Sequence, residues 1–435
     1  MTVRLHPTDA QTYWMSAKIP NDQFLLYCFD TDSPAESVRE ELLRRAEQIS
    51  DLGMRIVDFP LSLRYPSLRR APDTTDLVHI RETGRTWRDC LDTVAEAFTD
   101  QLDPHGSVWR LHLVGGVTGA PRCDGPALVA ILQISHAFGD GRVASSLARR
   151  LFGDDRSAPA PIADRTRIGP REFFRRATRA HDLERQLAAD TAAGTVPAPT
   201  PGRPRIRVNV APAGRTSVRC LVRDRSDFTA PGISVTVGAA TAISLALERY
   251  LAHHGDPVPP ELGAEATLGK HGERRARNHF GNAGVDLRPD ITDLAARAHA
   301  ISESLQARRR RAAHPAAEAQ SLASEAVPAV LLHWGVRQFD ATAVPDTVTG
   351  NTVLSSVARG AADLEVGGGP VRFTAGFPAL SPIMGLTHGV HGIGDAVTVS
   401  VTSAASAMPD PDVYCSFLDR AIDEVSTALR RSCAR

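Results

Sequence analysis

The residue best suited to chemistry is His136. It follows an apolar run over residues 128–135 and is the first residue of the string HAFGDG at 136–141. An imidazole with a pKa near its ordinary value accepts a proton from a hydroxyl or an amine at neutral pH. Asp140 lies four residues on and can turn back to brace the loop. The two glycines of the string permit backbone dihedrals that other residues resist. We therefore interpret His136 as a general base.

The elements on either side would place this histidine at the exit of a buried strand. Residues 128–135 have the length and apolar character of a strand in the core, and Val143, Leu147 and Leu151 recur every four residues, as on one face of a helix. A histidine after a strand is by itself commonly an ordinary loop residue. The full string and its position between a strand and a helix favour the catalytic interpretation.

Length and composition set the class of protein. The chain has 435 residues, which suits two domains of about 200 residues each. Hydrophobic residues make up 42% and charged residues 23%, as in an ordinary soluble protein. The formal net charge is zero, so nothing global favours a nucleic acid or a membrane surface as partner.

Cysteines and histidines give no pattern typical of a metal site or a disulfide framework. The six cysteines are scattered, without a C-x-x-C pair. His388 and His391 have H-x-x-H spacing, but no third ligand is evident and the surrounding glycines predict an irregular loop. No signal peptide is evident and no apolar run reaches the ~18 residues of a membrane span, so we expect a cytoplasmic protein without a transmembrane segment.

The pattern along the chain predicts an α/β protein with mixed elements in both halves. Residues 255–280 are polar and predict a loop, and 281–285 predict a tight turn into a strand. A helix over 316–339 would place His333 and Trp334 toward the core. The chain has neither a glycine-rich phosphate loop nor a G-x-S-x-G motif, which disfavours nucleotide-dependent enzymes and serine hydrolases.

A Pro-rich stretch over 193–205 is the clearest linker, and it follows a segment rich in Ala, Pro and Arg. We therefore predict an N-terminal lobe over residues 1–155 that carries the histidine string. A helical and Pro-rich crossover linker follows over 156–205, and a C-terminal lobe covers 206–435. A cleft between two α/β lobes suits a small-molecule site.

Several of these segments together resemble the bacterial wax ester synthase/diacylglycerol acyltransferase family, within the superfamily of CoA-dependent acyltransferases and condensation domains. The resemblance spans most of the chain, and HAFGDG with its preceding strand is its most specific part. The matching segments are Pro7-Thr8-Asp9-Ala10, Leu102-Asp103-Pro104 before the strand WRLHLV, HAFGDG at 136–141, Gly281-Asn282, and the closing strand and helix from Ala396 onward.

The resemblance implies two chloramphenicol-acetyltransferase-like lobes that form a V, with a tunnel at their interface and His136 inside it. His136 would take the proton from an acceptor as it attacks a thioester carbonyl, without an acyl-enzyme. Asp140 would pair with an arginine and hold the loop, and Gly141 would allow close packing. Ser135 and Asn282 would line the tunnel.

The chain departs from the family pattern mostly in its second half. Ser135 replaces the first of two consecutive histidines, and Thr236-Val237 replaces an Asn-Asp pair. The family's Pro-Val-Ser segment is not recognisable. The string Ser-Asn-Val-Pro-Gly-Pro reads here as Ser-Ser-Val-Ala-Arg-Gly over 355–360. These departures leave the acceptor open between a long-chain alcohol, a diacylglycerol and a specialised metabolite.

Three functions remain open at this point. The first is an O-acyltransferase that forms an ester from an acyl-CoA and a hydroxyl acceptor, with no bound cofactor. The second is a condensation-type enzyme of natural product biosynthesis that takes its acyl group from an acyl or peptidyl carrier protein and forms an amide or an ester. The third is a non-catalytic homologue that binds a carrier or a ligand. CoA and a carrier protein offer the same thioester arm, so the sequence does not separate them.

Overall fold

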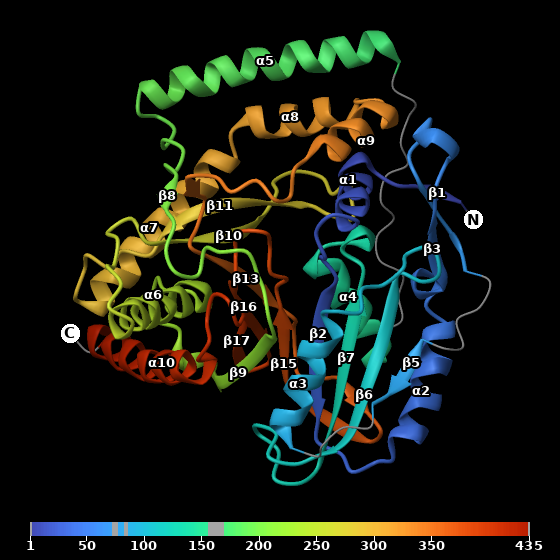
Figure 1. The fold of residues 1–435 in the computed structure, drawn as a ribbon, viewed down its shortest axis with the longest axis vertical. Coiled ribbons are helices and arrows are strands. Elements are labelled where there is room, and N and C mark those ends of the chain that lie inside the picture. Colours follow the sequence, from blue (N-terminus) through green and yellow to red (C-terminus); the bar gives the residue numbers. More distant parts are fainter. Residues whose placement is uncertain (1, 72–76, 82–85, 155–168, 434–435) are drawn as a thin grey trace.

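The computed structural model describes residues 2–71, 77–81, 86–154 and 169–433. Its two largest sheets have six strands each, and helices flank both sheets (Figure 1). This arrangement confirms the predicted α/β class. The described N-terminal end and the C-terminal helix lie on opposite sides of the molecule (Figure 1).

The first sheet has the order β14-β15-β2-β7-β6-β5 and holds the strand that leads to His136. Strands β5 and β6 run parallel, and the other neighbours are antiparallel. Every residue of β7 is buried, as its apolar composition predicts. The strands are β2 (Gln23–Phe29), β5 (Val78–Ile80), β6 (Trp109–Val117), β7 (Ala127–Ile134), β14 (Glu365–Val366) and β15 (Gly369–Phe377).

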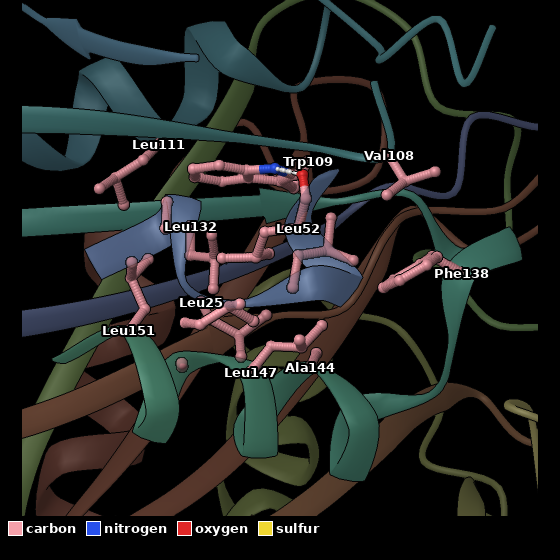
Figure 2. Packing of buried hydrophobic residues seen from close by; sticks show 14 of the residues in the cluster. Leu25, Leu52, Val108, Trp109, Leu111, Leu132, Phe138, Ala144, Leu147 and Leu151 are labelled. Carbon is pink, nitrogen blue, oxygen red and sulfur yellow. Dashed lines mark hydrogen bonds between the residues drawn. The ribbon is translucent and has the colours of Figure 1, made fainter. Parts of the chain in front are cut away.

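The helix after His136 is fixed by the core of the first sheet. In Figure 2 the apolar side of α4 (Gly141–Phe152), with Leu147 and Leu151, faces Leu25 of β2 and Leu132 of β7. The spacing of these leucines therefore predicted both the helix and its buried face correctly. Other helices beside this sheet are α1 (Pro7–Ser16), α2 (Ala35–Glu47) and α3 (Trp87–Ala97).

The second sheet has the order β11-β10-β13-β16-β17-β9, in which β10, β13 and β16 run parallel. Its core is packed against the helices α6 (Val235–His253), α7 (Leu294–Ala312) and α10 (Pro411–Cys433). The strands are β9 (Thr216–Asp224), β10 (Gly263–Gly269), β11 (Phe280–Asp286), β13 (Thr352–Ala358), β16 (Leu386–Ile393) and β17 (Ala396–Ala404).

The two halves of the sequence exchange elements. Strands β14 and β15 come late in the chain, yet β15 pairs with β2 in the first sheet. The helix α9 (Ala329–Gln338) likewise packs on α1. Sheet pairing therefore crosses the division that we predicted at residues 205 and 206.

The predicted linker contains a long helix. Residues 156–168 lie outside the described residues, and α5 (Pro170–Ala192) packs along α8 (Pro315–Glu325) at the top of Figure 1. The helical piece expected near 172–189 is confirmed. Minor elements complete the chain: β1 (Val3–Arg4), β3 (Met54–Val57), β4 (Ser67–Arg70), β8 (Arg203–Pro204), β12 (Thr347–Val348), and the 3-10 turns η1 (Ser50–Gly53), η2 (Pro60–Ser62), η3 (His136–Phe138) and η4 (Arg225–Asp227).

Four local predictions were wrong. Residues 281–285 lie within the strand β11, and the polar segment 255–280 contains β10. The two strands pair with each other along their full length. The single helix predicted over 316–339 is broken between α8 and α9, where Pro328 precedes the second helix. Trp334 is 63% exposed and does not face the core.

Candidate active site

His136 lies in the single 3-10 turn η3, between the end of β7 and the start of α4. The residue is half-buried, and its Nδ1 atom is buried without a hydrogen-bond partner. Burial lowers the pKa of His136, although the Asn278 amide and the carboxylates of Asp140 and Asp9 favour the charged form. The ring is therefore neutral at pH 7, as a general base requires.

Asp140 ties this turn to the second half of the chain. Its Oδ1 atom caps α4 by accepting from the backbone N–H groups of Arg142 and Val143, at 3.1 Å each. Its Oδ2 atom pairs with Arg274 Nη2 at 3.0 Å and accepts from the N–H of His279 at 3.0 Å. One buried carboxylate thus stabilises both the helix start and a distant loop.

The glycines of the string are needed for space and not for unusual dihedrals. Gly139 has φ 161°, an extended conformation, and Gly141 begins α4 without a left-handed backbone. Our expectation of special dihedrals was therefore wrong. A Cβ on Gly139 would lie 2.6 Å from the Val143 side chain, and one on Gly141 would lie 3.4 Å from Val357 across the two halves.

The segment over residues 274–279, which we call the latch segment, holds the His136 turn from the other half of the chain. Asp9 of α1 accepts from the N–H of Arg277 at 3.0 Å and from the N–H and side-chain amide of Asn278 at 2.8 and 3.0 Å. Burial raises the pKa of Asp9 despite these hydrogen bonds. The Asn278 amide also donates to the His136 carbonyl oxygen at 2.9 Å.

Arg277 gives the latch segment a second attachment. Its guanidinium lies over the Phe138 ring, 4.3 Å from the centroid, and pairs with Asp51 at 3.0 Å. Arg150 of α4 pairs with the same carboxylate at 2.9 Å. Burial alone would raise the pKa of Asp51, but the two arginines together lower it.

Ser135 and Asn282 occupy different surroundings. Ser135 is 1% exposed, and its N–H donates to the Val108 carbonyl. Asn282 is exposed on β11, where its amide donates to Glu265 at 2.6 Å. Phe280 lies two residues earlier on the same face of β11, with its ring 5.5 Å from that of His136. The predicted role of Ser135 and Asn282 as tunnel-lining residues stays a prediction.

A cavity of about 900 Å³ lies beside this turn, between α4 and the end of β13. On the α4 side its wall begins at Arg142, six residues after His136, and His136 itself is not among the lining residues. The cavity therefore approaches the histidine from the α4 side, and a tunnel that reaches the ring stays a prediction. The lining residues are Arg142, Ser145, Ser146, Arg149, Arg150, Gly153, Asp154, Ser356, Val357, Ala358, Arg359, Gly360, Asp363 and Leu364.

Sequence reasoning missed the residues that come from the latch segment. Arg274, Asn278 and His279 lie in the stretch that we expected to be a polar loop, and no spacing relates them to His136. A signal existed for Asp9, because it belongs to a segment that carries the family resemblance. Its role as the acceptor for the latch segment emerged only from the fold.

His388 and His391 do not join this site. Both lie in the regular strand β16, which overturns the irregular loop that we expected there. The ring of His388 contacts Thr352 through Nδ1 and Tyr414 through Nε2, both at 2.8 Å. Within the described part of the chain, one group of side chains is close enough together to hold a metal ion: single ligand atoms of His253, His254 and Asp410 lie within 4.8 Å of one another.

None of the helices within the described ranges is long and apolar enough to cross a membrane.

Comparison with known families matches both halves of the chain. The wax ester synthase/diacylglycerol acyltransferase catalytic domain matches residues 5–231, and the C-terminal domain of the same family matches residues 277–426. No protein of curated function matches the chain in sequence.

Solved structures share the whole fold at low sequence identity. The wax ester synthase/diacylglycerol acyltransferase of Marinobacter aquaeolei VT8 has a TM-score of 0.65 at 16% identity, with 98% of this chain and 99% of that chain covered. The trichothecene 15-O-acetyltransferase of Fusarium sporotrichioides has a TM-score of 0.59 at 13% identity, covering 98% and 95%. A variant of the starter condensation domain of rhizomide synthetase, in complex with C8-CoA and Leu-SNAC, has a TM-score of 0.57 at 11% identity, covering 99% and 94%.

Proposed function

Because the chain belongs to the wax ester synthase/diacylglycerol acyltransferase family, with the two chloramphenicol-acetyltransferase-like lobes expected of it, we propose that it is an O-acyltransferase. The donor is an acyl-CoA thioester and the acceptor is a small molecule with a hydroxyl group. The product is an ester, and no bound cofactor takes part.

In this proposal His136 is the general base. The imidazole takes the proton of the acceptor hydroxyl while the oxygen attacks the thioester carbonyl. The resulting tetrahedral intermediate expels the thiolate, so a C–O bond forms and the C–S bond breaks. His136 then returns the proton to the leaving sulfur, which regenerates the neutral ring without an acyl-enzyme. A positioned base of this kind contributes about 10²–10⁴-fold in rate.

One observation carries the proposal: a partly buried histidine, whose pKa is lowered by burial, lies on a turn that both halves of the chain hold in place. Asp140 and Asn278 act as positioning residues, because Asp140 caps the helix that follows the turn and the Asn278 amide donates to the His136 backbone carbonyl. Fixing the base in this way lowers the entropic cost of reaching the reactive geometry.

Thiol release tests the proposal. The purified protein is incubated with acyl-CoAs of several chain lengths and with panels of alcohols and amines, and free thiol is followed with time. Acyl groups on carrier proteins form a second set of donors. We expect release with at least one acyl-CoA and alcohol pair, and a loss of about 10²–10⁴-fold in kcat for His136→Ala.

His279→Ala is the matched control, because His279 is a second partly buried histidine that also contacts Asp140, through its backbone N–H only. Its replacement leaves that backbone bond in place, so we expect a much smaller loss. Thiol release with carrier-bound donors alone would mean that the acyl donor is a carrier-protein thioester and not an acyl-CoA. Absence of release with every pair would favour a binding protein without activity.

A further inference from the structure

Arg359 differs from every other buried arginine of the described chain in having no carboxylate partner. Arg150, Arg203, Arg219 and Arg297 pair with Asp51, Asp286, Asp412 and Glu248, respectively. Arg359 is 3% exposed and donates through Nη1 to Thr374 Oγ1 at 2.8 Å, while its Nε atom is buried without a partner. A buried charge without a counterion is costly, so a native site that keeps one needs an explanation.

The surroundings of Arg359 are polar and incompletely bonded. Its guanidinium lies 5.3 Å from the Tyr27 ring centroid, and the Tyr27 hydroxyl is near enough to favour the charged form without a well-aligned hydrogen bond. His391 and Thr398, opposite each other on β16 and β17, each have a buried side-chain atom without a partner. Burial lowers the pKa of Arg359, which is the effect a bound anion would reverse.

Arg359 also belongs to the wall of the cavity beside α4, and that wall carries an excess of positive charge. Four arginines and two aspartates line it. Two of those arginines, Arg149 and Arg150, have carboxylate partners in Asp363 and Asp51. The other two, Arg142 and Arg359, have none among the described residues, and Arg142 is exposed at the rim.

The position is one where this chain departs from its family. In the segment over residues 355–360, Arg359 stands where the family string Ser-Asn-Val-Pro-Gly-Pro has its glycine. Two other departures are in contact with each other, because Thr236 and Ser356 hydrogen-bond through their hydroxyls at 2.8 Å, and Ser356 lines the same cavity. These three departures thus lie at or next to one cavity, as a change of ligand would require, whereas Ser135 is not among its lining residues.

We propose that Arg359 is the anchor of a carboxylate-binding site in this cavity, and that the enzyme takes a substrate with a free carboxylate at the end of a short chain. A guanidinium presents two parallel donors that match a carboxylate. One monoanion balances one guanidinium, whereas a phosphate dianion would leave surplus negative charge in a buried site. Naming the ligand as a substrate rests on the proposed acyl transfer.

The geometry also sets the length of the ligand. Val357 packs against Gly141 of the His136 turn, and Arg359 lies two residues further on, just past the end of β13, or roughly 7 Å along the chain. A chain of several carbons is therefore needed between the reacting group and the carboxylate. The carboxylate could belong to the acyl donor or to the acceptor, which the experiment separates.

Binding is tested first, because it does not depend on turnover. Hexanoate and hexanol are titrated into the wild-type protein and into Arg359→Gln by calorimetry. We expect the wild type to bind hexanoate more tightly than hexanol, and Arg359→Gln to weaken hexanoate alone by about 10- to 100-fold. Equal binding of the two compounds, or an unchanged affinity for hexanoate in Arg359→Gln, would overturn the proposal.

Two variants guard against a merely structural role. Arg359→Gly restores the family residue and should weaken hexanoate binding as Arg359→Gln does. Without ligand, Arg359→Gln should not melt below the wild type, since the charge that it removes is uncompensated. Arg142→Gln removes a charge from the cavity rim and should change hexanoate affinity far less. An equal loss of hexanoate affinity with Arg142→Gln would mean that the general positive charge of the cavity attracts the carboxylate. That result would overturn the proposed site at Arg359.

Turnover then identifies the source of the carboxylate. Adipoyl-CoA is compared with hexanoyl-CoA as donor, and a hydroxyhexanoate with hexanol as acceptor. Arg359→Gln should lower kcat/KM for the anionic member of one pair by about 10- to 100-fold and leave its neutral member unchanged. An equal loss for all four compounds would overturn the proposal. Absence of turnover with every compound would count against the proposed activity, and the calorimetry would still decide the carboxylate site.

Discussion

Two histidines with lowered pKa values lie in different surroundings. The pKa of His136 and that of His388 are both lowered by burial, to about 3 for His388. His388 lies in the middle of β16, and both of its ring nitrogens have hydrogen-bond partners. His136 lies on a turn, half-buried, with its Nδ1 atom unpartnered.

The difference lies in what each ring is free to do. A histidine whose two nitrogens are both bonded in a core stabilises that core and has no capacity left for a substrate. The His136 ring is neutral and partly accessible, and contacts from the other half of the chain hold its backbone. A depressed pKa therefore marks a candidate base only where the ring also keeps an open position.

Removal of the carboxylate that holds the His136 turn should have the largest effect on stability and activity. Asp140→Ala deletes the buried carboxylate that caps α4, and it leaves the partly buried Arg274 without its counterion. We expect the free energy of unfolding to fall by about 3 kcal/mol, with kcat reduced as well because the turn loses its anchor. Urea unfolding and thiol release measure the two effects.

Asp290→Ala is the control for this variant. Asp290 pairs with Arg288 at 2.7 Å on the surface, so its loss should cost less than about 1 kcal/mol and leave kcat unchanged. If Asp140→Ala cost as little as the control, the contrast between an anchored turn and an ordinary loop would fail.

The core histidine should respond in stability alone. His388→Phe leaves the Tyr414 hydroxyl buried without its partner, which we expect to lower the free energy of unfolding by about 2 kcal/mol. The kcat of the folded protein should stay at the wild-type value. Chemical denaturation and thiol release on the same sample measure both quantities.

A second replacement sharpens this prediction. Tyr414→Phe in the His388→Phe background removes the unpaired hydroxyl, so part of the lost stability should return. If the stability losses of His388→Phe and Tyr414→Phe simply add in the double variant, the hydrogen bond between the two side chains does not contribute to stability. A fall in kcat would mean that His388 acts on the site and that the comparison with His136 is wrong.

The sequence predicted those parts of the site that are local. The strand, turn and helix around His136 follow from an uninterrupted apolar run and from leucines four residues apart, since each pattern spans fewer than about 20 residues. The buried core that Figure 2 shows behind α4 was predictable for the same reason.

The contacts that hold the turn were not predictable, because they join distant residues. Asp9 and Asn278 are 269 residues apart, and a polar stretch such as 274–279 has the composition of any loop. The prediction for Trp334 was wrong for the opposite reason, because it relied on a local pattern alone. Helical spacing suggested that this face is buried, but the Trp334 side chain of α9 is exposed. Periodicity identifies an apolar face, and only the packed fold determines whether anything covers it.

The pH dependence of catalysis should show the smallest and most specific effect. The folded pKa of His136 lies below 6.5, so kcat/KM should be flat near neutral pH and fall only as acid protonates the ring, with a midpoint below 6.5. Asp140 favours the charged form of His136, so Asp140→Asn, which removes that charge but keeps an oxygen to cap α4, should move the midpoint to lower pH. Stopped assays between pH 4 and 8 measure both profiles. A midpoint above 6.5, or a shift upward in Asp140→Asn, would assign the rate-controlling proton to a group other than His136.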